Sequence, residues 1–429
     1  LPTFFMNMFG QPVLTAQANG AAEERVTNIE VSMVLDISGS MDVGNRMVNL
    51  RPAARNFVST ILAPNNTPTG GKRVSVSLVP YDHAVNIGPA LASVFSLSDE
   101  HSYSTCVRFF TNDFTFSGID PTVPLQRMGH FDVANSVTDP VQRPACRRGT
   151  SGAIIPWAHD EAALHTAIDN LSPFGFTASD QGMRWAVALL DPTARPALAG
   201  LISNGTVHSD FAGRPATFSD PDTIKIVVLM TDGENTRQFD LQDNFRTGPS
   251  PFWRDNDDGD FSVFYSEWNM FWQEDNDRWS VNPDGGPNTN AVQLDYSDLW
   301  NHISVQQLRA RMFHPDAWER HEGQPSSTNL WRRATIEAMQ ARYDYADVVN
   351  DYSADNGIVG DERLRAICDV AHAQDIVVFA IAFEAPERGQ QLMRYCASSD
   401  AHYYDAAGLN IQDVFASIAG TINDLRLVQ

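Results

Sequence analysis

Two apolar segments that lie far apart in the sequence each end in an acidic turn, and this pattern limits what the chain can fold into. The first, residues 31–41, reads Val-Ser-Met-Val-Leu-Asp-Ile-Ser-Gly-Ser-Met. The second, residues 226–233, reads Ile-Val-Val-Leu-Met-Thr-Asp-Gly. Short apolar runs bounded by turn residues are typical of strands buried on both faces of a parallel sheet. We therefore expect two buried strands, each with a carboxylate at its carboxyl end.

Strand-like and helix-like segments alternate along most of the chain. The apolar patterns predict strands over 29–36, 74–79, 224–230, 376–383 and 401–404. They predict helices over 45–62, 161–171, 179–190, 361–373, 387–396 and 411–427. This alternation indicates an α/β fold built on a doubly wound, mostly parallel sheet. Ligands of such sheets bind beyond the carboxyl ends of the strands, which is where both acidic turns lie.

Three stretches lack this periodicity. Residues 1–27 are irregular, and we expect them to be the tail of a preceding region that is missing here. Residues 90–158 and 237–360 are interpreted as two large irregular insertions in a domain that spans 28–429. The second insertion holds seven of the nine tryptophans. They either form its own small core or present aromatic faces to a sugar or a protein partner.

The charge balance narrows the classes of partner. The formal net charge of −23 argues against nucleic acid, because phosphate binding relies on clustered Lys and Arg. It favours cations or basic protein surfaces. The longest apolar runs are strand-sized, so none spans a bilayer. We expect any membrane anchor to lie upstream of residue 1.

Four cysteines occur, at positions 106, 146, 368 and 396, and they allow three pairings. We expect Cys106–Cys146 and Cys368–Cys396, because the members of each pair lie within one local segment. Four buried free thiols are the alternative. Disulfides would place the chain outside the cytoplasm: at the cell surface, in the periplasm or secreted.

The acidic turns carry the residue types of a cation site. Asp36, Ser38, Ser40 and Asp232 supply hard oxygen ligands, which suit Mg²⁺ or Mn²⁺. The carboxylates are too few to saturate such an ion, so an Asp or Glu carboxylate from a protein ligand is expected to complete its shell. The alternative is that the two aspartates are ordinary turn acids and the serines cap helices.

A second acidic stretch, Asp255-Asn-Asp257-Asp258-Gly-Asp260, is open to two interpretations. The density of acids resembles a Ca²⁺ loop, but the spacing departs from the EF-hand pattern because Gly falls at the fifth position and Glu is missing at the twelfth. The other interpretation is a solvated acidic loop.

The chain resembles von Willebrand factor type A domains. Asp36-Ile-Ser38-Gly-Ser40 matches the metal-ion-dependent adhesion site of that family, in which a Thr from a separate loop and a later Asp complete the ligands. The resemblance implies that Asp232 is this Asp. It implies that the Thr is Thr177, with Thr206 and Thr217 as alternatives.

A closer resemblance is to the TadG-like pilus-assembly proteins of bacterial tight-adherence (Flp) pili. It is carried by segments that read Val-Ser-Val-Ser-Leu-Val-Pro-Tyr, Leu-Arg-Ala-Ile-Cys, Ile-Val-Val-Phe-Ala-Ile-Ala-Phe, Tyr-Cys-Ala-Ser and Tyr-Tyr-Asp-Ala, beginning at residues 74, 364, 376, 395 and 403. It covers most of the chain outside 237–360. Those proteins usually begin with a transmembrane helix and a pilin-like region, and this sequence contains neither.

The resemblance implies a non-enzymatic adhesion or protein-binding module of the bacterial envelope or surface, tied to pilus assembly. A structural subunit of a surface filament, with the domain as scaffold, is the alternative. A metal-dependent hydrolase is disfavoured, because Glu234 is the only general-base candidate near the acidic turns in the sequence.

Overall fold

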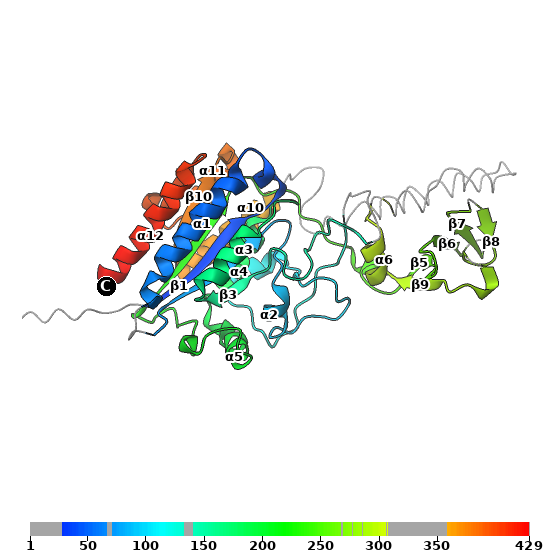
Figure 1. Ribbon diagram of the computed structural model, residues 1–429, viewed down its shortest axis with the longest axis horizontal. Coiled ribbons are helices and arrows are strands. Elements are labelled where there is room, and N and C mark those ends of the chain that lie inside the picture. The colour runs from blue at the N-terminus through cyan, green and yellow to red at the C-terminus, as the bar shows by residue number, and fades with distance from the viewer. Residues whose placement is uncertain are drawn as a thin grey trace, which may run out of the picture.

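The computed structural model describes residues 28–66, 71–132, 140–266, 269–276, 278–284, 286–305, 307 and 358–428. Two sheets organise these residues, as Figure 1 shows. The larger sheet forms an α/β body, and the smaller sheet lies at the far end of the long axis. The predicted α/β class with a doubly wound, mostly parallel sheet is confirmed.

The main sheet has six strands in the order β11-β10-β4-β1-β2-β3. Their bounds are β1 Asn28–Asp36, β2 Val74–Tyr81, β3 Ile155–Ala158, β4 Thr223–Thr231, β10 Val377–Phe383 and β11 Tyr403–Ala406. All pairs are parallel except β2 with β3. Strand β3 lies inside the predicted first insertion and was not expected from the sequence. A four-residue edge strand is too short to show a clear period.

Helices cover both faces of this sheet. Helices α1, α3 and α12 pack on one face, and α4, α10 and α11 on the other. Their bounds are α1 Arg46–Leu62, α3 Glu161–Asp169, α4 Ser179–Ala188, α10 Ile358–Ala373, α11 Glu387–Cys396 and α12 Asn410–Val428. Strand β1 shows why two layers are needed, since Met33 and Leu35 contribute to one core and Val34 to the other.

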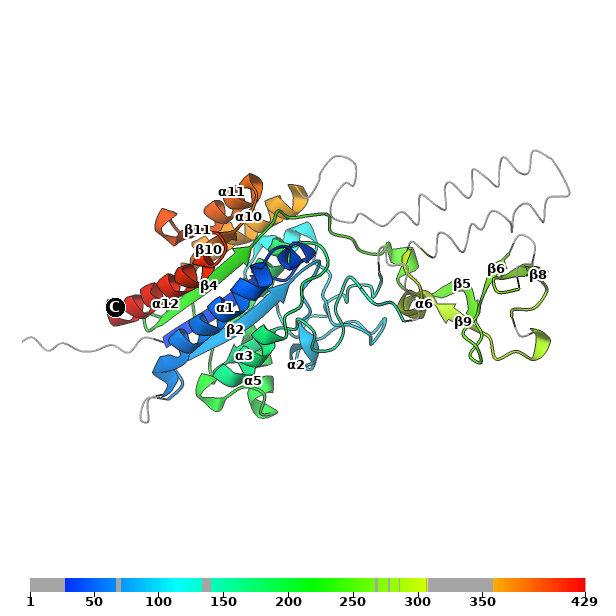
Figure 2. The same ribbon diagram turned by 45° about the horizontal axis from the view of Figure 1, so that its top comes forward.

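Strand register brings the two acidic turns together. β1 pairs with β4 so that Leu35 lies opposite Met230, and both strands end within the next two residues. β2 flanks β1 on the other side, with Tyr81 opposite Asp36. Three strand ends therefore meet at one edge of the sheet, which Figure 2 shows from a second direction.

The described part of the 237–360 stretch contains a five-stranded antiparallel sheet, in the order β8-β7-β6-β5-β9, followed by α6. Their bounds are β5 Pro249–Arg254, β6 Phe261–Tyr265, β7 Met270–Gln273, β8 Arg278–Ser280, β9 Val292–Asp295 and α6 Tyr296–His302. Trp272 and Trp300 are buried, and Trp253 and Trp279 are half-buried, which fits the interpretation that these tryptophans build a local core. Trp268, Trp318 and Trp331 lie outside the described residues.

The two insertions pack against each other. Phe131 and Cys146 of the first share a buried cluster with Phe252, Leu299 and Trp300 of the second. Two further helices of the described ranges, α2 Gly88–Ala92 and α5 Arg195–Ser203, flank the α/β body. None of the helices in the described ranges is both long enough and apolar enough to cross a lipid bilayer.

Both expected cysteine pairs form disulfides. Cys106–Cys146 lies within the shared cluster of the insertions, and Cys368–Cys396 joins α10 to α11. Free thiols, the alternative interpretation, are excluded, because no free cysteine is present.

Candidate metal centre

Asp36 lies at the centre of the carboxyl edge of the main sheet and is fully buried. Its Oδ1 accepts a hydrogen bond from the amide of Ser38 at 2.8 Å, which closes the tight turn after β1. Its Oδ2 accepts from Thr231 Oγ1 at 2.8 Å and from the Tyr81 hydroxyl at 3.3 Å. Strand ends on both sides of β1 therefore fix the orientation of this carboxylate.

The two serine hydroxyls link the first acidic turn to the second. Ser38 Oγ lies 3.0 Å from Ser40 Oγ, and Ser40 Oγ donates to Asp232 Oδ1 at 2.7 Å. Residues separated by almost two hundred positions are thus joined by direct side-chain hydrogen bonds. The structure places four of the five predicted residues in one hydrogen-bonded group.

The fifth residue, Thr177, adjoins this group. It is buried, and a Cβ built on Gly233 would lie 3.6 Å from Thr177 Oγ1 and 3.8 Å from Ser40 Oγ. Its amide donates to Thr236 Oγ1 at 2.9 Å, and its carbonyl accepts from the Thr236 amide at 2.9 Å, so it is tied to the loop that bears Asp232.

The two alternative threonines lie elsewhere. Thr217 lines a cavity together with Asn28 and Thr223, the first residues of β1 and β4, at the opposite edge of the sheet. The amide of Thr206 donates to the Leu201 carbonyl at the end of α5. Thr177 is therefore the threonine that the fold brings to the two acidic turns.

A buried ion pair holds the loop that carries Thr177. Arg147 Nε lies 2.6 Å from Asp82 Oδ2, and both side chains are almost completely buried. The Arg147 guanidinium also donates to the carbonyls of Ile37, Ser172 and Phe174. One side chain thereby clamps the Asp36 turn against the Thr177 loop. Nothing local in the sequence indicated this role, because Arg147 comes from the first insertion.

Two further contributors were also missed. Thr231 and Tyr81 both donate to Asp36, although the sequence analysis assigned neither to the site. A signal existed in each case, since Thr231 directly precedes Asp232 and Tyr81 follows the predicted strand 74–79 by two residues. Neither signal identifies a contact with Asp36 until the order of the strands in the sheet is known.

Arg46 supplies a positive charge at the rim of the site. Its Nη1 donates to Asp232 Oδ2 at 2.7 Å and its Nε to Glu384 Oε2 at 3.0 Å. The Arg46 side chain is 19% exposed and that of Asp232 is fully buried. This guanidinium neutralises one oxygen of Asp232 and leaves the charge of Asp36 without a basic neighbour among the contacts just described.

Burial of two carboxylates in one group raises their proton affinity. Desolvation, and then the charge of Asp232, raise the pKa of Asp36 to about 7. Burial also raises the pKa of Asp232, while its hydrogen bond from Ser40 and the neighbouring Arg46 oppose the rise. The group therefore lacks positive charge, and a bound divalent cation would favour the ionised form of both aspartates.

The donors fit a hard divalent cation. Two carboxylates and three hydroxyls supply only oxygen atoms, the ligands preferred by Mg²⁺ and Mn²⁺. Among the residues that the structure describes, no group of three or more His, Cys, Asp or Glu side chains is arranged as a metal site. A saturated all-carboxylate site of the kind that encloses Ca²⁺ is therefore not found in those ranges.

The acidic turn between β5 and β6 uses its aspartates locally. Asp255 Oδ1 accepts from the Asp257 amide and Asp258 Oδ1 from the Asp260 amide, at 2.8 and 3.1 Å. The Asp257 carboxylate accepts from Asn290 Nδ2 at 2.9 Å. These contacts are those of a tight acidic hairpin, and the Ca²⁺ site stays a prediction.

Comparisons with known proteins give similarity in solved structures only. No protein-family model matches the chain, and no curated protein matches it. The vWF domain of the type V pili tip protein Mfa5 from Porphyromonas gingivalis has a TM-score of 0.40 and 13% identity, over 94% of this chain and 97% of that one. The pilus adhesin SpaC from Lactobacillus rhamnosus GG has a TM-score of 0.35 and 13% identity, over 93% and 31%.

Proximal thread matrix protein 1 from the mussel byssus, in a structure with a zinc-occupied MIDAS motif, has a TM-score of 0.31 and 10% identity, over 92% of this chain and 47% of that one. The chain thus spans less than half the length of SpaC and of the mussel protein. At such low identities and TM-scores, these similarities do not indicate what this chain binds, and a proposal has to rest on the residues of the site.

Proposed function

We propose that this protein is a non-enzymatic binding module in which Asp36, Ser38, Ser40, Thr177 and Asp232 hold Mg²⁺ or Mn²⁺. A bound ion would supply a coordination position for an Asp or Glu carboxylate of a protein ligand. The observation that carries the proposal is the hydrogen-bonded chain from Ser38 through Ser40 to Asp232, beside a buried Asp36.

The chain's own residues have three tasks in this proposal. Asp36 is oriented by Thr231 and Tyr81, so that its carboxylate cannot turn away from the site. Arg147 keeps the loop of Thr177 against the turn after β1. Arg46 at the rim attracts anionic groups and neutralises part of Asp232.

A hydrolytic role has less support. Glu234, the candidate base, is partly exposed and lies 3.7 Å from the guanidinium of Arg388. We therefore place the protein among adhesion or assembly proteins, outside the cytoplasm, in agreement with its two disulfides. A role in tight-adherence pilus assembly, beside TadG-like proteins, is part of the proposal.

Metal binding is tested by thermal unfolding of the metal-free protein during titration with Mg²⁺. We expect Tm to rise with Mg²⁺ concentration for the wild type and for Asp42→Ala, an exposed acid of the same turn. We expect no rise for Asp36→Ala or Asp232→Ala, and all four proteins should show native circular dichroism. Equal Mg²⁺ stabilisation of the site variants would refute the metal centre.

The open position is tested with Mn²⁺ as the probe. Titration of the Mn²⁺-loaded protein with acetate and with a short Glu-containing peptide should change the electron paramagnetic resonance signal of the bound ion. An unchanged signal with both ligands would contradict carboxylate capture. Concentration-dependent assembly that persists in EDTA would instead favour a filament subunit that uses the domain as a scaffold.

A further inference from the structure

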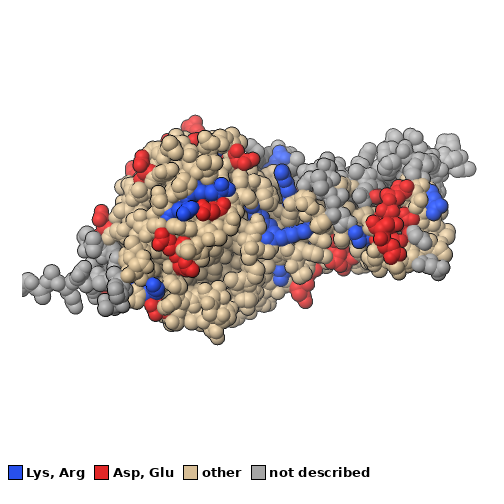
Figure 3. Space-filling model, viewed as in Figure 1, with Lys and Arg blue, Asp and Glu red and all other residues tan. Residues whose placement is uncertain are grey.

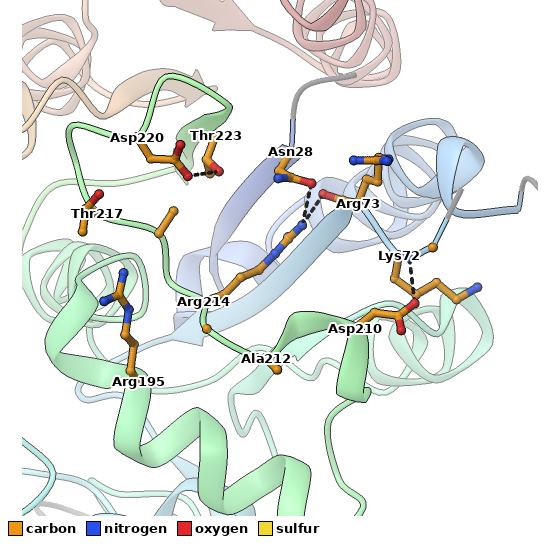
Figure 4. A pocket seen from close by; sticks show the side chains of 13 residues that line it. Asn28, Lys72, Arg73, Arg195, Asp210, Ala212, Arg214, Thr217, Asp220 and Thr223 are labelled. Atoms are coloured by element: carbon orange, nitrogen blue, oxygen red, sulfur yellow. Dashed lines mark hydrogen bonds between the residues drawn. The ribbon is translucent and has the colours of Figure 1, made fainter. Parts of the chain in front are cut away.

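A second polar site lies at the other edge of the main sheet. A cavity of about 480 Å³ opens where β1 and β4 begin, and Asn28 and Thr223, the first residues of these strands, line it. Figure 4 shows this cavity with the loop that follows α5. Nine-residue strands separate it from the metal centre by roughly 25 Å, so the two sites share no residue.

The lining of the cavity is basic, although the chain as a whole is strongly acidic. The whole chain has a formal net charge of −23 and contains only two lysines, one of which lines this cavity. Two acids, Asp210 and Asp220, are also present. The cationic side chains of the lining are Lys72, Arg73, Arg195 and Arg214. Positive charge thus exceeds negative charge by two.

Both acids already accept hydrogen bonds from other groups of the protein. Asp210 Oδ2 accepts from the Lys72 amide at 2.9 Å. Asp220 accepts from Thr223 Oγ1 at 2.9 Å and from the Asp222 amide at 3.1 Å. Within the described ranges, neither acid forms an ion pair with an arginine of the cavity, so the basic charges are not cancelled internally.

Arg214 is a rigidly held part of the cavity wall. It is buried and donates to the Arg73 carbonyl at 2.8 Å and to Asn28 Oδ1 at 3.2 Å. Its guanidinium also lies 4.8 Å from the centre of the Phe211 ring. The N–H groups of Arg214 in these contacts are bonded within the protein, while its positive charge remains beside the cavity.

Two other arginines keep free donors. Among the described residues, Arg195 donates only through Nε, to the Pro215 carbonyl at 2.9 Å, and the guanidinium of Arg73 has no hydrogen-bond or ion-pair partner. Both side chains are half-buried. In Figure 4, Arg195 extends toward the loop of Thr217 and Asp220, while Arg73 lies beside Asn28, on the other side of Arg214.

We propose that this cavity binds a phosphate-bearing small molecule. Guanidinium groups present paired N–H donors that match phosphate oxygens, and the two uncancelled positive charges correspond to a phosphate dianion. The volume lies within the range of small-molecule sites. The threonine hydroxyls and the asparagine amide of the lining supply further neutral hydrogen-bonding groups.

The test is calorimetric titration of the full chain, free of divalent metal and at low ionic strength, with inorganic phosphate and with glycerol 1-phosphate. Working without metal separates the result from the metal centre. We expect one site per chain for phosphate and its ester. Succinate and a tetraglutamate peptide, at matched ionic strength, should bind at least tenfold more weakly.

Two pairs of substitutions complete the experiment. Arg73→Gln with Arg195→Gln should weaken phosphate binding at least tenfold, and each single variant should weaken it less. Arg55→Gln with Arg143→Gln removes the same charge from exposed side chains outside the cavity, that of Arg55 being 43% exposed, and should leave binding unchanged. Absence of binding by the wild type, an equal loss in the exposed pair, or preferential binding of succinate or the acidic peptide would overturn the proposal.

Discussion

At the scale of residues, the candidate metal centre is a group of carboxylates that lacks positive charge. Asp36 and Asp232 are both buried, and Arg46 compensates only part of their charge. Burial of an unpaired carboxylate costs free energy unless the group takes up a proton or a cation. This shortage of positive charge gives the site its expected affinity for a divalent ion.

Arg46 should compete with that ion. We expect Arg46→Gln to raise Mg²⁺ affinity about tenfold, because a unit charge in contact with a ligand carboxylate repels a nearby cation by more than about 1 kcal/mol. Mg²⁺ titration followed by calorimetry measures this, with Arg55→Gln as an exposed control on the same helix. A fall in affinity would show that Arg46 mainly positions Asp232.

His83 should make stability depend on pH. Burial lowers the pKa of His83 from 6.5 to about 4. Between these pH values the unfolded chain binds a proton at this position and the folded chain does not, so the free energy of unfolding falls as the pH falls through this window. The loss from this residue is about 3 kcal/mol at most.

The measurement is urea unfolding at pH 7.5, 5.5 and 4.5, for the wild type and for His83→Gln. The wild type should lose stability more steeply than the variant below pH 6.5. Parallel pH profiles for the two proteins would show that His83 does not contribute in this way.

At the scale of elements, α11 supports the loop that bears Asp232. Gly389 of α11 approaches this loop so closely that a Cβ would overlap the carbonyl oxygen of Gly233. Asn235, farther along the loop, accepts from the amide and the hydroxyl of Ser179 at the start of α4. The second acidic turn is therefore positioned by two helices in addition to the end of β4.

Gly389→Ala should displace that turn. We expect it to weaken Mg²⁺ binding about tenfold or more, because backbone must move to accept the methyl group, whereas the fold should persist. Gly420→Ala in α12 is the matched control, since a Cβ there meets nothing within 4 Å, and alanine should be neutral or slightly stabilising in a helix. Thermal unfolding with and without Mg²⁺ separates the two effects. Unchanged Mg²⁺ stabilisation in Gly389→Ala would contradict this account.

At the scale of the whole molecule, the insertions are coupled to the metal centre. The Cys106–Cys146 disulfide lies in the core shared by both insertions, and the next residue, Arg147, clamps the loops around Asp36. Figure 3 shows acidic side chains gathered over the small sheet at the far end. In this part of the chain, the hydrogen bond with Asp275 and then burial raise the pKa of Asp260 to about 6, and the charges of Asp275, Asp258 and Asp284 add to the rise. The insertions therefore set the arrangement of the site at one end and the surface charge at the other.

Loss of Cys106–Cys146 should affect both stability and metal binding. We expect Cys106→Ala with Cys146→Ala to lower the free energy of unfolding by about 4 kcal/mol, from the entropy of the closed loop. Mg²⁺ affinity should fall as well, because Arg147 loses its anchor. The Cys368–Cys396 disulfide closes a loop of similar length. Its removal in Cys368→Ala with Cys396→Ala should therefore cost similar stability but lower the Mg²⁺ affinity less. Equal Mg²⁺ affinities in the two double variants would contradict the proposed coupling between the Cys106–Cys146 disulfide and the metal centre.

The sequence by itself determined the α/β class, most strands and helices of the main sheet, and the two acidic turns, because these depend on local patterns of apolar and turn residues. Strand order and packing between distant segments decided the rest. Only the tertiary structure distinguished Thr177 from Thr206 and Thr217, brought Tyr81 to Asp36 and Arg147 to the turn that follows Asp36, and created the basic cavity at the opposite edge. No local pattern encodes such contacts, since each joins side chains from strands, loops and insertions that meet only when the sheet assembles.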